Sequence, residues 1–392
     1  KTKMQMKNRN ILVFIFSIYL CLMSWYLYTH QYYNVDLEAY AGLIYKAEYP
    51  DMKIEDIHKK VYNELKGTNP KLFGITPQDE EIAKGENTYY KVLSENPKAY
   101  GEELQLFSVK PFYNFVNLMF FKLGFKITTS VFLTSIVSYV LILILVFCYL
   151  IKTIKNYPLA FIITILISLF KPLLEASRHA SADSLSCLLL LLSLYVFIVR
   201  KNHLAATVFA MLCILTRPEY FILYSFFYIL AYFFKNSLQI TTVKLFLSYG
   251  YVFLSFFLIQ YFNQISWSTL FMNQFTKVQI YPISNPDPFY FPDYFNFIKK
   301  TIMLDFNGSY FPLLLLFIVV ILANKFSVSS KKSWAQCLFF GAIYASVFLR
   351  FLVFPSLANR MMIGFYLIII LSLIYIQNSK TDIFKNSLEA GK

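Results

Sequence analysis

Residues 127–151 read ITTSVFLTSIVSYVLILILVFCYLI, an apolar run without a charged side chain. A run of this length can cross the hydrocarbon core of a bilayer as one helix, which takes roughly 20 residues. The whole chain has the same bias, because 57% of its residues are hydrophobic and only 15% are charged. So few charges cannot cover the surface of a water-soluble protein of 392 residues. The run and the composition therefore predict an all-α polytopic membrane protein.

Further apolar runs on both sides of this one bring the predicted total to about ten transmembrane helices. They cover residues 11–29, 157–170, 185–199, 204–215, 220–234, 243–262, 310–323, 335–349 and 361–376. Several runs are shorter than a full span, so broken or re-entrant helices also fit the pattern. No small-residue cleavage site follows the first run, which favours a retained helix over a cleaved signal peptide.

Basic and acidic residues divide between the two predicted sides of the membrane. A cytoplasmic N-terminus puts the basic residues between the runs, among them Lys152, Arg200 and Lys332, in cytoplasmic turns. Of the 22 acidic residues, only Asp382 and Glu389 fall on that side. Both termini are therefore predicted to be cytoplasmic. Because the basic residues flank apolar runs and do not gather on one solvated face, the net charge of +14 does not predict nucleic-acid binding.

Two long loops are predicted on the outward side of a single transmembrane module, residues 1–392. In the first loop, residues 30–126, apolar positions recur with helical spacing over residues 52–65. This loop is expected to fold as amphipathic or interfacial helices on the outer leaflet. The second loop, residues 263–309, carries closely spaced prolines, which interrupt a continuous helix. It is a candidate lid or rim.

Charged side chains at the membrane edge are costly, so each one is a candidate for function. On the predicted topology all of them meet on the outward side. They are Asp36 and Glu38 after the first run, Lys110 before Pro111, Arg178, His179 and Asp183 in one short loop, Arg217 and Glu219 around Pro218, and Arg360 at the start of the last run. Cations facing carboxylates suit an anionic lipid-phosphate head group, with one carboxylate left as a base on a hydroxyl.

Each candidate also has a purely structural interpretation. Asp36 can cap the helix that follows it, and Arg217 can satisfy the broken end of a helix. Lys110 can anchor an interfacial segment among lipid head groups. His179 has no companion at a metal-ligand spacing, so contact with a phosphate or a sugar hydroxyl is favoured over metal binding. Two nearby acidic groups are compatible with a divalent cation, but their spacing does not establish a metal or cofactor.

The order of these features resembles the GT-C superfamily of polyprenyl-phosphate-dependent glycosyltransferases. The resemblance covers nearly the whole chain. It rests on Asp36, Glu38 and Tyr40 after the first helix, on Lys110-Pro111-Phe112-Tyr113, on residues 181–186, on Leu215-Thr216-Arg217-Pro218-Glu219, and on Asn359-Arg360-Met361. It implies a helical membrane fold, a lipid-phosphate-sugar donor and transfer with inversion, with Asp36 as the base on the acceptor or the residue that orients it.

The expected function is therefore transfer of a sugar from a polyprenyl-phosphate carrier to a glycan, lipid or protein acceptor. The expected location is a bacterial inner membrane, with the site facing outward among the membrane lipids. A surface-polysaccharide polymerase or ligase acting on polyprenyl-diphosphate-linked glycans is one alternative. A lipid or solute transporter or flippase is another, for which internal pseudo-symmetry and charges near mid-membrane are expected. Neither feature is evident in the runs.

Overall fold

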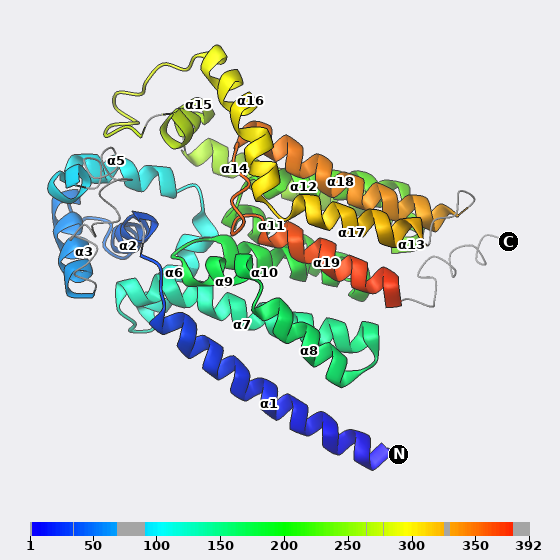
Figure 1. The fold of residues 1–392 in the computed structure, drawn as a ribbon. Helices are drawn as coiled ribbons and strands as arrows, with labels where there is room; N and C mark the ends of the chain where they lie inside the picture. Colours follow the sequence, from blue (N-terminus) through cyan, green and yellow to red (C-terminus); the bar gives the residue numbers. More distant parts are fainter. Residues whose placement is uncertain are drawn as a thin grey trace.

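The computed structural model describes residues 2–33, 35–68, 91–263, 265–276, 278–324 and 330–378. Within these ranges the chain is helical and contains no strand. The first helix begins, and the last described helix ends, at the same end of the bundle, which we call the basic end (Figure 1). The opposite end, which we call the loop end, carries a layer of shorter helices. The predicted cytoplasmic tail with Asp382 and Glu389 lies outside the described residues.

Five helices among the described residues are long and apolar enough to cross a membrane, or up to seven if each of two bent pairs forms one span. The five are α1 (Thr2–Thr29), α7 (Ile127–Ile154), α10 (Asp183–Leu194) continued by η2 (Tyr195–Arg200), α14 (Thr242–Asn263) and α18 (Lys331–Val353). The bent pairs are α8 (Tyr157–Ser168) with α9 (Lys171–Arg178), and α16 (Phe291–Gly308) with α17 (Phe311–Ala323).

The prediction of ten spans is not confirmed. Three apolar runs form helices of 10–17 residues, which are shorter than a full crossing requires. These helices are α11 (His203–Thr216), α12 (Tyr220–Phe233) and α19 (Ile363–Asn378). The predicted helical membrane fold agrees with the structure, but the described residues contain five to seven candidate spans where about ten were predicted.

Prolines explain the bends. A proline ring clashes with the preceding turn of a helix and removes a backbone donor, but it is tolerated in the first turn. Pro172 lies in the first turn of α9 and Pro312 in that of α17, and the two helix pairs are bent by 58° and 61°. Pro292 likewise opens α16, so the proline-rich loop becomes helical from Phe291 onward.

The loop end is built from short helices of the two predicted outward loops. They are α2 (Val35–Glu48), α3 (Ile54–Thr68), α5 (Pro97–Phe107), α6 (Pro111–Lys122), α15 (Trp267–Phe271) and η3 (Met272–Thr276). Gly42 allows α2 and α5 to meet, because a Cβ there would overlap the Tyr100 hydroxyl. Glu102 of α5 accepts hydrogen bonds from the backbone nitrogens of Ile283 and Ser284 at 2.9 and 3.1 Å. These contacts join the two outward segments.

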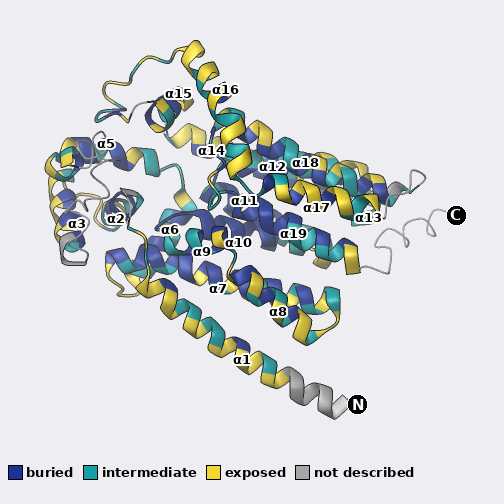
Figure 2. Ribbon diagram, in the orientation of Figure 1, coloured by how far each residue is buried: buried dark blue, intermediate teal, exposed yellow. Residues whose placement is uncertain are grey.

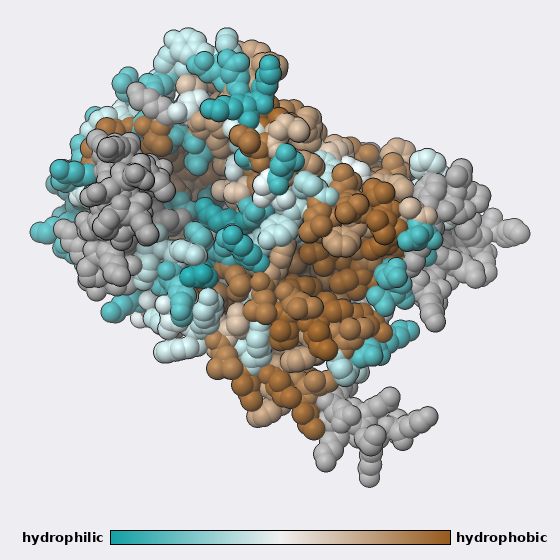
Figure 3. Space-filling view, viewed as in Figure 1, coloured by the Kyte–Doolittle hydropathy of each residue, from teal (hydrophilic) through white to brown (hydrophobic). Residues whose placement is uncertain are grey.

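The core lies along α7, α10, α11 and α19, whose side chains include many that are buried (Figure 2). α1 packs on α7 and α8 and remains largely exposed. Figure 3 shows hydrophobic side chains spread over the part of this face formed by α1, α8, α17 and α19. Polar side chains dominate the loop end in the same view. An apolar belt next to a polar cap is the surface that a helical membrane protein presents.

Candidate active site

The break between α11 and α12 sets the position of Arg217. Arg217 precedes Pro218, and a residue before proline is disfavoured in the helical conformation. Its backbone is accordingly extended, with φ −146° and ψ 99°, and α11 ends at Thr216. The guanidinium Nη1 lies 2.5 Å from Asp183 Oδ1, and Nη2 lies 2.9 Å from Glu219 Oε1. Because the Arg217 side chain is only 6% exposed, these carboxylates supply the counter-charge that a buried guanidinium requires.

Asp183 connects this pair to Arg360. It lies in the first turn of α10, where the helix dipole favours a negative charge. Its Oδ2 accepts a hydrogen bond from Ser181 Oγ at 3.0 Å and lies 3.2 Å from Arg360 Nη1. Arg360 Nη2 also lies 3.7 Å from Oδ2 of Asp36, in the first turn of α2. Both oxygens of Asp183 are therefore engaged, while Asp36 Oδ1 has no partner among the described residues.

Arg350 closes the other end of the network. It is 1% exposed inside α18, its Nη2 lies 3.4 Å from Glu219 Oε1, and its Nη1 donates to the Ser356 carbonyl at 2.7 Å. Ser356 belongs to the link between α18 and α19 that carries Arg360, so Arg350 helps to fix that link. Six side chains from five parts of the fold thus form an alternating series of charges. We call it the charge chain: Arg350, Glu219, Arg217, Asp183, Arg360 and Asp36.

Lys110 lies beside the charge chain at the start of α6. Its Nζ donates to Tyr40 Oη at 2.7 Å and lies 5.4 and 5.3 Å from the ring centroids of Tyr40 and Phe107. No carboxylate in the described part of the chain is within ion-pair distance of it. Burial lowers the pKa of Lys110, while the negative charge of Asp36 acts in the opposite direction. A half-buried ammonium without a paired anion favours a negatively charged ligand.

Glu38 does not join the charge chain. Helical positions two residues apart lie roughly 200° apart around the axis, so Asp36 and Glu38 face different ways. Glu38 packs among α2, α3 and α5, where Tyr62 Oη donates to its Oε2 at 2.7 Å and Tyr100 Oη donates to its backbone carbonyl at 2.7 Å. Burial raises the pKa of its carboxyl to about 7, against the hydrogen bond from Tyr62, with Glu103 adding a smaller increase.

The raised pKa of Glu38 predicts a pH dependence of stability. Below pH 4.5 the group is protonated in both states, and between pH 4.5 and about 7 the folded protein keeps a proton that the unfolded chain has lost. The stability of the folded state is therefore expected to fall as pH rises through this window, by on the order of 3 kcal/mol. Thermal unfolding in detergent between pH 4.5 and 8 should show this slope flattened in Glu38→Gln. An equally steep profile in the variant would contradict the assignment.

Arg178 and His179 lie at the edge of the site. Arg178 Nε donates to the His30 carbonyl at 2.5 Å and the guanidinium covers the Tyr32 ring at 4.1 Å, so its side chain is directed to the end of α1. His179 Nδ1 lies 2.7 Å from the Glu175 carbonyl oxygen. Burial lowers the pKa of His179 and the positive charge of Arg360 lowers it further, which favours a neutral imidazole beside the charge chain. The charges of Asp183 and Asp36 also act on His179, so its ring is within electrostatic reach of the charge chain.

Of the residues singled out from the sequence, five are in the charge chain and Lys110 is next to it. Sequence reasoning missed Arg350 because the apolar run was taken to end at residue 349, which left Arg350 outside it. Its position within an otherwise apolar stretch, Phe348-Leu349-Arg350-Phe351-Leu352, was the available signal. Sequence reasoning named Tyr40 only as the residue that follows the acidic motif and gave it no role of its own, whereas its hydroxyl accepts the hydrogen bond from Lys110.

None of the described His, Cys, Asp and Glu side chains form a group of three or more that could hold a metal ion. No family model, curated protein or solved structure matches the chain.

Proposed function

We propose that the protein is a membrane glycosyltransferase of the GT-C type, which transfers a sugar from a polyprenyl-phosphate carrier to a glycan, lipid or protein acceptor. The observation that carries this proposal is the meeting of the charge chain and Lys110 at the loop end. Residues from α2, α6, α10 and α18, and from the links before α12 and α19, contribute to it, although long stretches of sequence separate them. Several cations beside a partly exposed carboxylate are what a phosphate-linked donor and a hydroxyl acceptor require.

The proposed orientation has the loop end outside a bacterial inner membrane. All described acidic residues lie in the segments predicted to face outward, residues 30–126, 171–183 and 263–309, except Glu219 of the charge chain. The described charged residues in the turns at the opposite end are all basic. Cytoplasmic turns are enriched in lysine and arginine. The charge distribution therefore supports a cytoplasmic basic end and an outward-facing site.

In this proposal the cations bind the donor phosphate. Lys110 has no carboxylate partner in the described ranges, and Arg360 is 21% exposed, so both can donate to phosphate oxygens. The bond between the anomeric carbon and the phosphate oxygen breaks with its electron pair moving to the phosphate. Fixed positive charges stabilise the charge that develops there. A lipid phosphate is an adequate leaving group, so no general acid is needed.

Asp36 is the proposed base. Its side chain is 20% exposed, and Oδ1 has no partner within the described residues. The acceptor oxygen forms the new bond to the anomeric carbon from the face opposite the phosphate, and Asp36 takes the hydroxyl proton. Attack from that face inverts the anomeric configuration. Asp183 is unsuited to this role, because it is 3% exposed and both its oxygens are already engaged.

Binding of a polyprenyl monophosphate tests the donor site. Lys110→Gln is expected to weaken binding of undecaprenyl phosphate roughly 10-fold to 100-fold, because a hydrogen bond to a charged group contributes about 1.5–3 kcal/mol. Native mass spectrometry of the detergent-purified protein measures the retained lipid. Lys122→Gln is the matched control, since Lys122 ends the same helix and pairs with Glu48 at 3.1 Å.

Equal loss of the lipid in Lys110→Gln and Lys122→Gln would contradict a donor site at Lys110. Selective retention of a diphosphate-linked oligosaccharide would instead favour the polymerase or ligase. Binding of no prenyl lipid would favour the transporter.

A further inference from the structure

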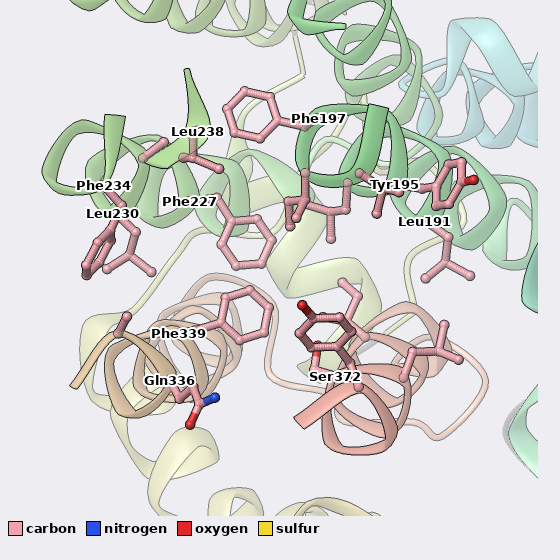
Figure 4. Close-up of a pocket in the computed structure, with 18 of the residues that line it drawn as sticks. Leu191, Tyr195, Phe197, Phe227, Leu230, Phe234, Leu238, Gln336, Phe339 and Ser372 are labelled. Atoms are coloured by element: carbon pink, nitrogen blue, oxygen red, sulfur yellow. The ribbon is translucent and has the colours of Figure 1, made fainter. Parts of the chain in front are cut away.

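A cavity lies in the basic half of the bundle, away from the charge chain. Its volume is about 310 Å³, and its walls come from η2, α12, α18 and α19, with contributions from α7, α10 and α13 (Lys235–Leu238). Figure 4 shows Phe197, Phe227, Phe339 and Leu230 around it. Phe227 and Phe339 stack with their ring centroids 5.5 Å apart. The lining is almost entirely apolar, so the space suits a hydrocarbon chain.

The rim of this cavity is basic. Lys201 and Lys332 are among its lining residues. The described charged side chains at this end of the bundle are all basic: Lys152, Lys155, Arg200, Lys201, Lys235, Lys244 and Lys332. An apolar cavity with a positive rim is complementary to a lipid that carries a hydrocarbon tail and a negative head group.

The distance along α10 and η2 assigns the rim to one leaflet. Asp183 of the charge chain begins this span and Lys201 follows its end, and at the helical rise the two are roughly 25 Å apart along the axis. That length is close to the thickness of a bilayer core. A lipid whose head group is at Lys201 therefore belongs to the leaflet opposite the active site, and a donor phosphate beside Lys110 would not need this rim.

The backbone at the cavity is also unusual. η2 is a π-helical turn, Tyr195–Arg200, and it supplies several lining residues. π-helical turns are rare and occur frequently at functional sites. The turn ends at Lys201, whose φ of 52° is left-handed. This irregular segment thus supplies part of the cavity wall and Lys201, one of the two rim lysines.

We propose that this cavity binds an acyl chain of an anionic glycerophospholipid from the leaflet at the basic end, with Lys201 and Lys332 facing the phosphate of its head group. A soluble metabolite would need polar groups that converge inside the cavity. The polar lining residues are few, and the two charged ones are these lysines.

The test compares two lipids on the delipidated, detergent-purified full chain. Palmitoyl-oleoyl phosphatidylglycerol should be retained more strongly than palmitoyl-oleoyl phosphatidylcholine in native mass spectrometry. Lys201→Gln with Lys332→Gln should reduce retention of phosphatidylglycerol at least tenfold, because each basic residue near a membrane surface contributes roughly fivefold to anionic lipid binding. Equal retention of the two lipids by the unaltered protein would overturn the proposal.

A matched double variant separates a specific site from general attraction to the basic end. Lys155→Gln with Lys244→Gln removes the same charge from residues that do not line the cavity. Each control lysine matches a rim lysine in its local structure. Lys155 follows the end of α7 with φ 58°, and Lys201 follows the end of η2 with φ 52°. Lys244 lies in the first turn of α14, and Lys332 lies in the first turn of α18. Retention should be unchanged in this variant. A loss as large as that of the rim variant would contradict the proposal.

Ser372→Phe tests the cavity itself, because the larger side chain would fill space next to Ser372 in α19. Retention of phosphatidylglycerol should fall without a change in the lysines. Lys110→Gln should leave it unchanged. If Lys110→Gln removed phosphatidylglycerol, the retained lipid would lie beside the charge chain and not in this cavity, and the proposal would be wrong.

Discussion

Asp36→Asn is expected to abolish measurable sugar transfer while leaving the protein folded. A positioned base typically contributes 10²-fold to 10⁴-fold to a rate, and the asparagine amide has the shape of the carboxylate but cannot accept the hydroxyl proton. The cost in stability should be small, because Asp36 is partly exposed and its distance to Arg360 is 3.7 Å. Turnover of a polyprenyl-phosphate-linked sugar by the purified variant, together with its thermal unfolding midpoint, measures both effects.

Glu38→Gln is the matched control for this experiment. Glu38 lies two residues away on the same helix but faces Tyr62 and not the charge chain. Its replacement should keep transfer near the original rate at neutral pH. Retained turnover in Asp36→Asn would remove Asp36 as the base. Equal loss of turnover in both variants would indicate that α2 as a whole, and not one carboxylate, is needed.

The helical, apolar character of the fold could be predicted from composition because it depends on sums over many residues. The number of spans could not. Runs such as 204–215 and 220–234 look like separate spans in sequence, yet they form helices too short to cross a bilayer alone. Whether a short helix crosses, tilts or stays buried is decided by its neighbours, and the run itself does not contain that information.

The members of the site could largely be predicted, but their arrangement could not. Charge at a membrane edge singles out Arg217, Asp183 and Arg360 individually. Their pairing depends on where α11 stops and on the path of the link before α19, both of which are tertiary features. Asp36 and Glu38 show most clearly why the arrangement could not be predicted. An extended backbone would have placed both side chains on one face, whereas the helix that forms separates them.

Removal of Asp183 is expected to cause the largest loss of stability. Asp183→Ala leaves Arg217 and Arg360 without the carboxylate between them, and breaking one partner of a buried pair typically costs about 3–5 kcal/mol. Arg217 retains Glu219, but its Nη1 would lose the acceptor now 2.5 Å away. The thermal unfolding midpoint in detergent should fall sharply, and donor binding should fall with it.

Two comparisons make this result interpretable. Glu175→Ala breaks an exposed pair with Lys171, where the two side chains are 31% and 74% exposed, and should cost less than about 1 kcal/mol. Asp183→Ala combined with Arg217→Met removes both buried charges and should recover part of the stability but none of the activity. If Asp183→Ala cost as little stability as Glu175→Ala, Asp183 would not compensate a buried charge. If Asp183→Ala with Arg217→Met were less stable than Asp183→Ala alone, Arg217 would stabilise the fold even without Asp183. We therefore expect Asp183 to hold the charge chain together and Asp36 to act in the reaction. Asp183→Ala should lower both the unfolding midpoint and turnover, whereas Asp36→Asn should lower turnover alone.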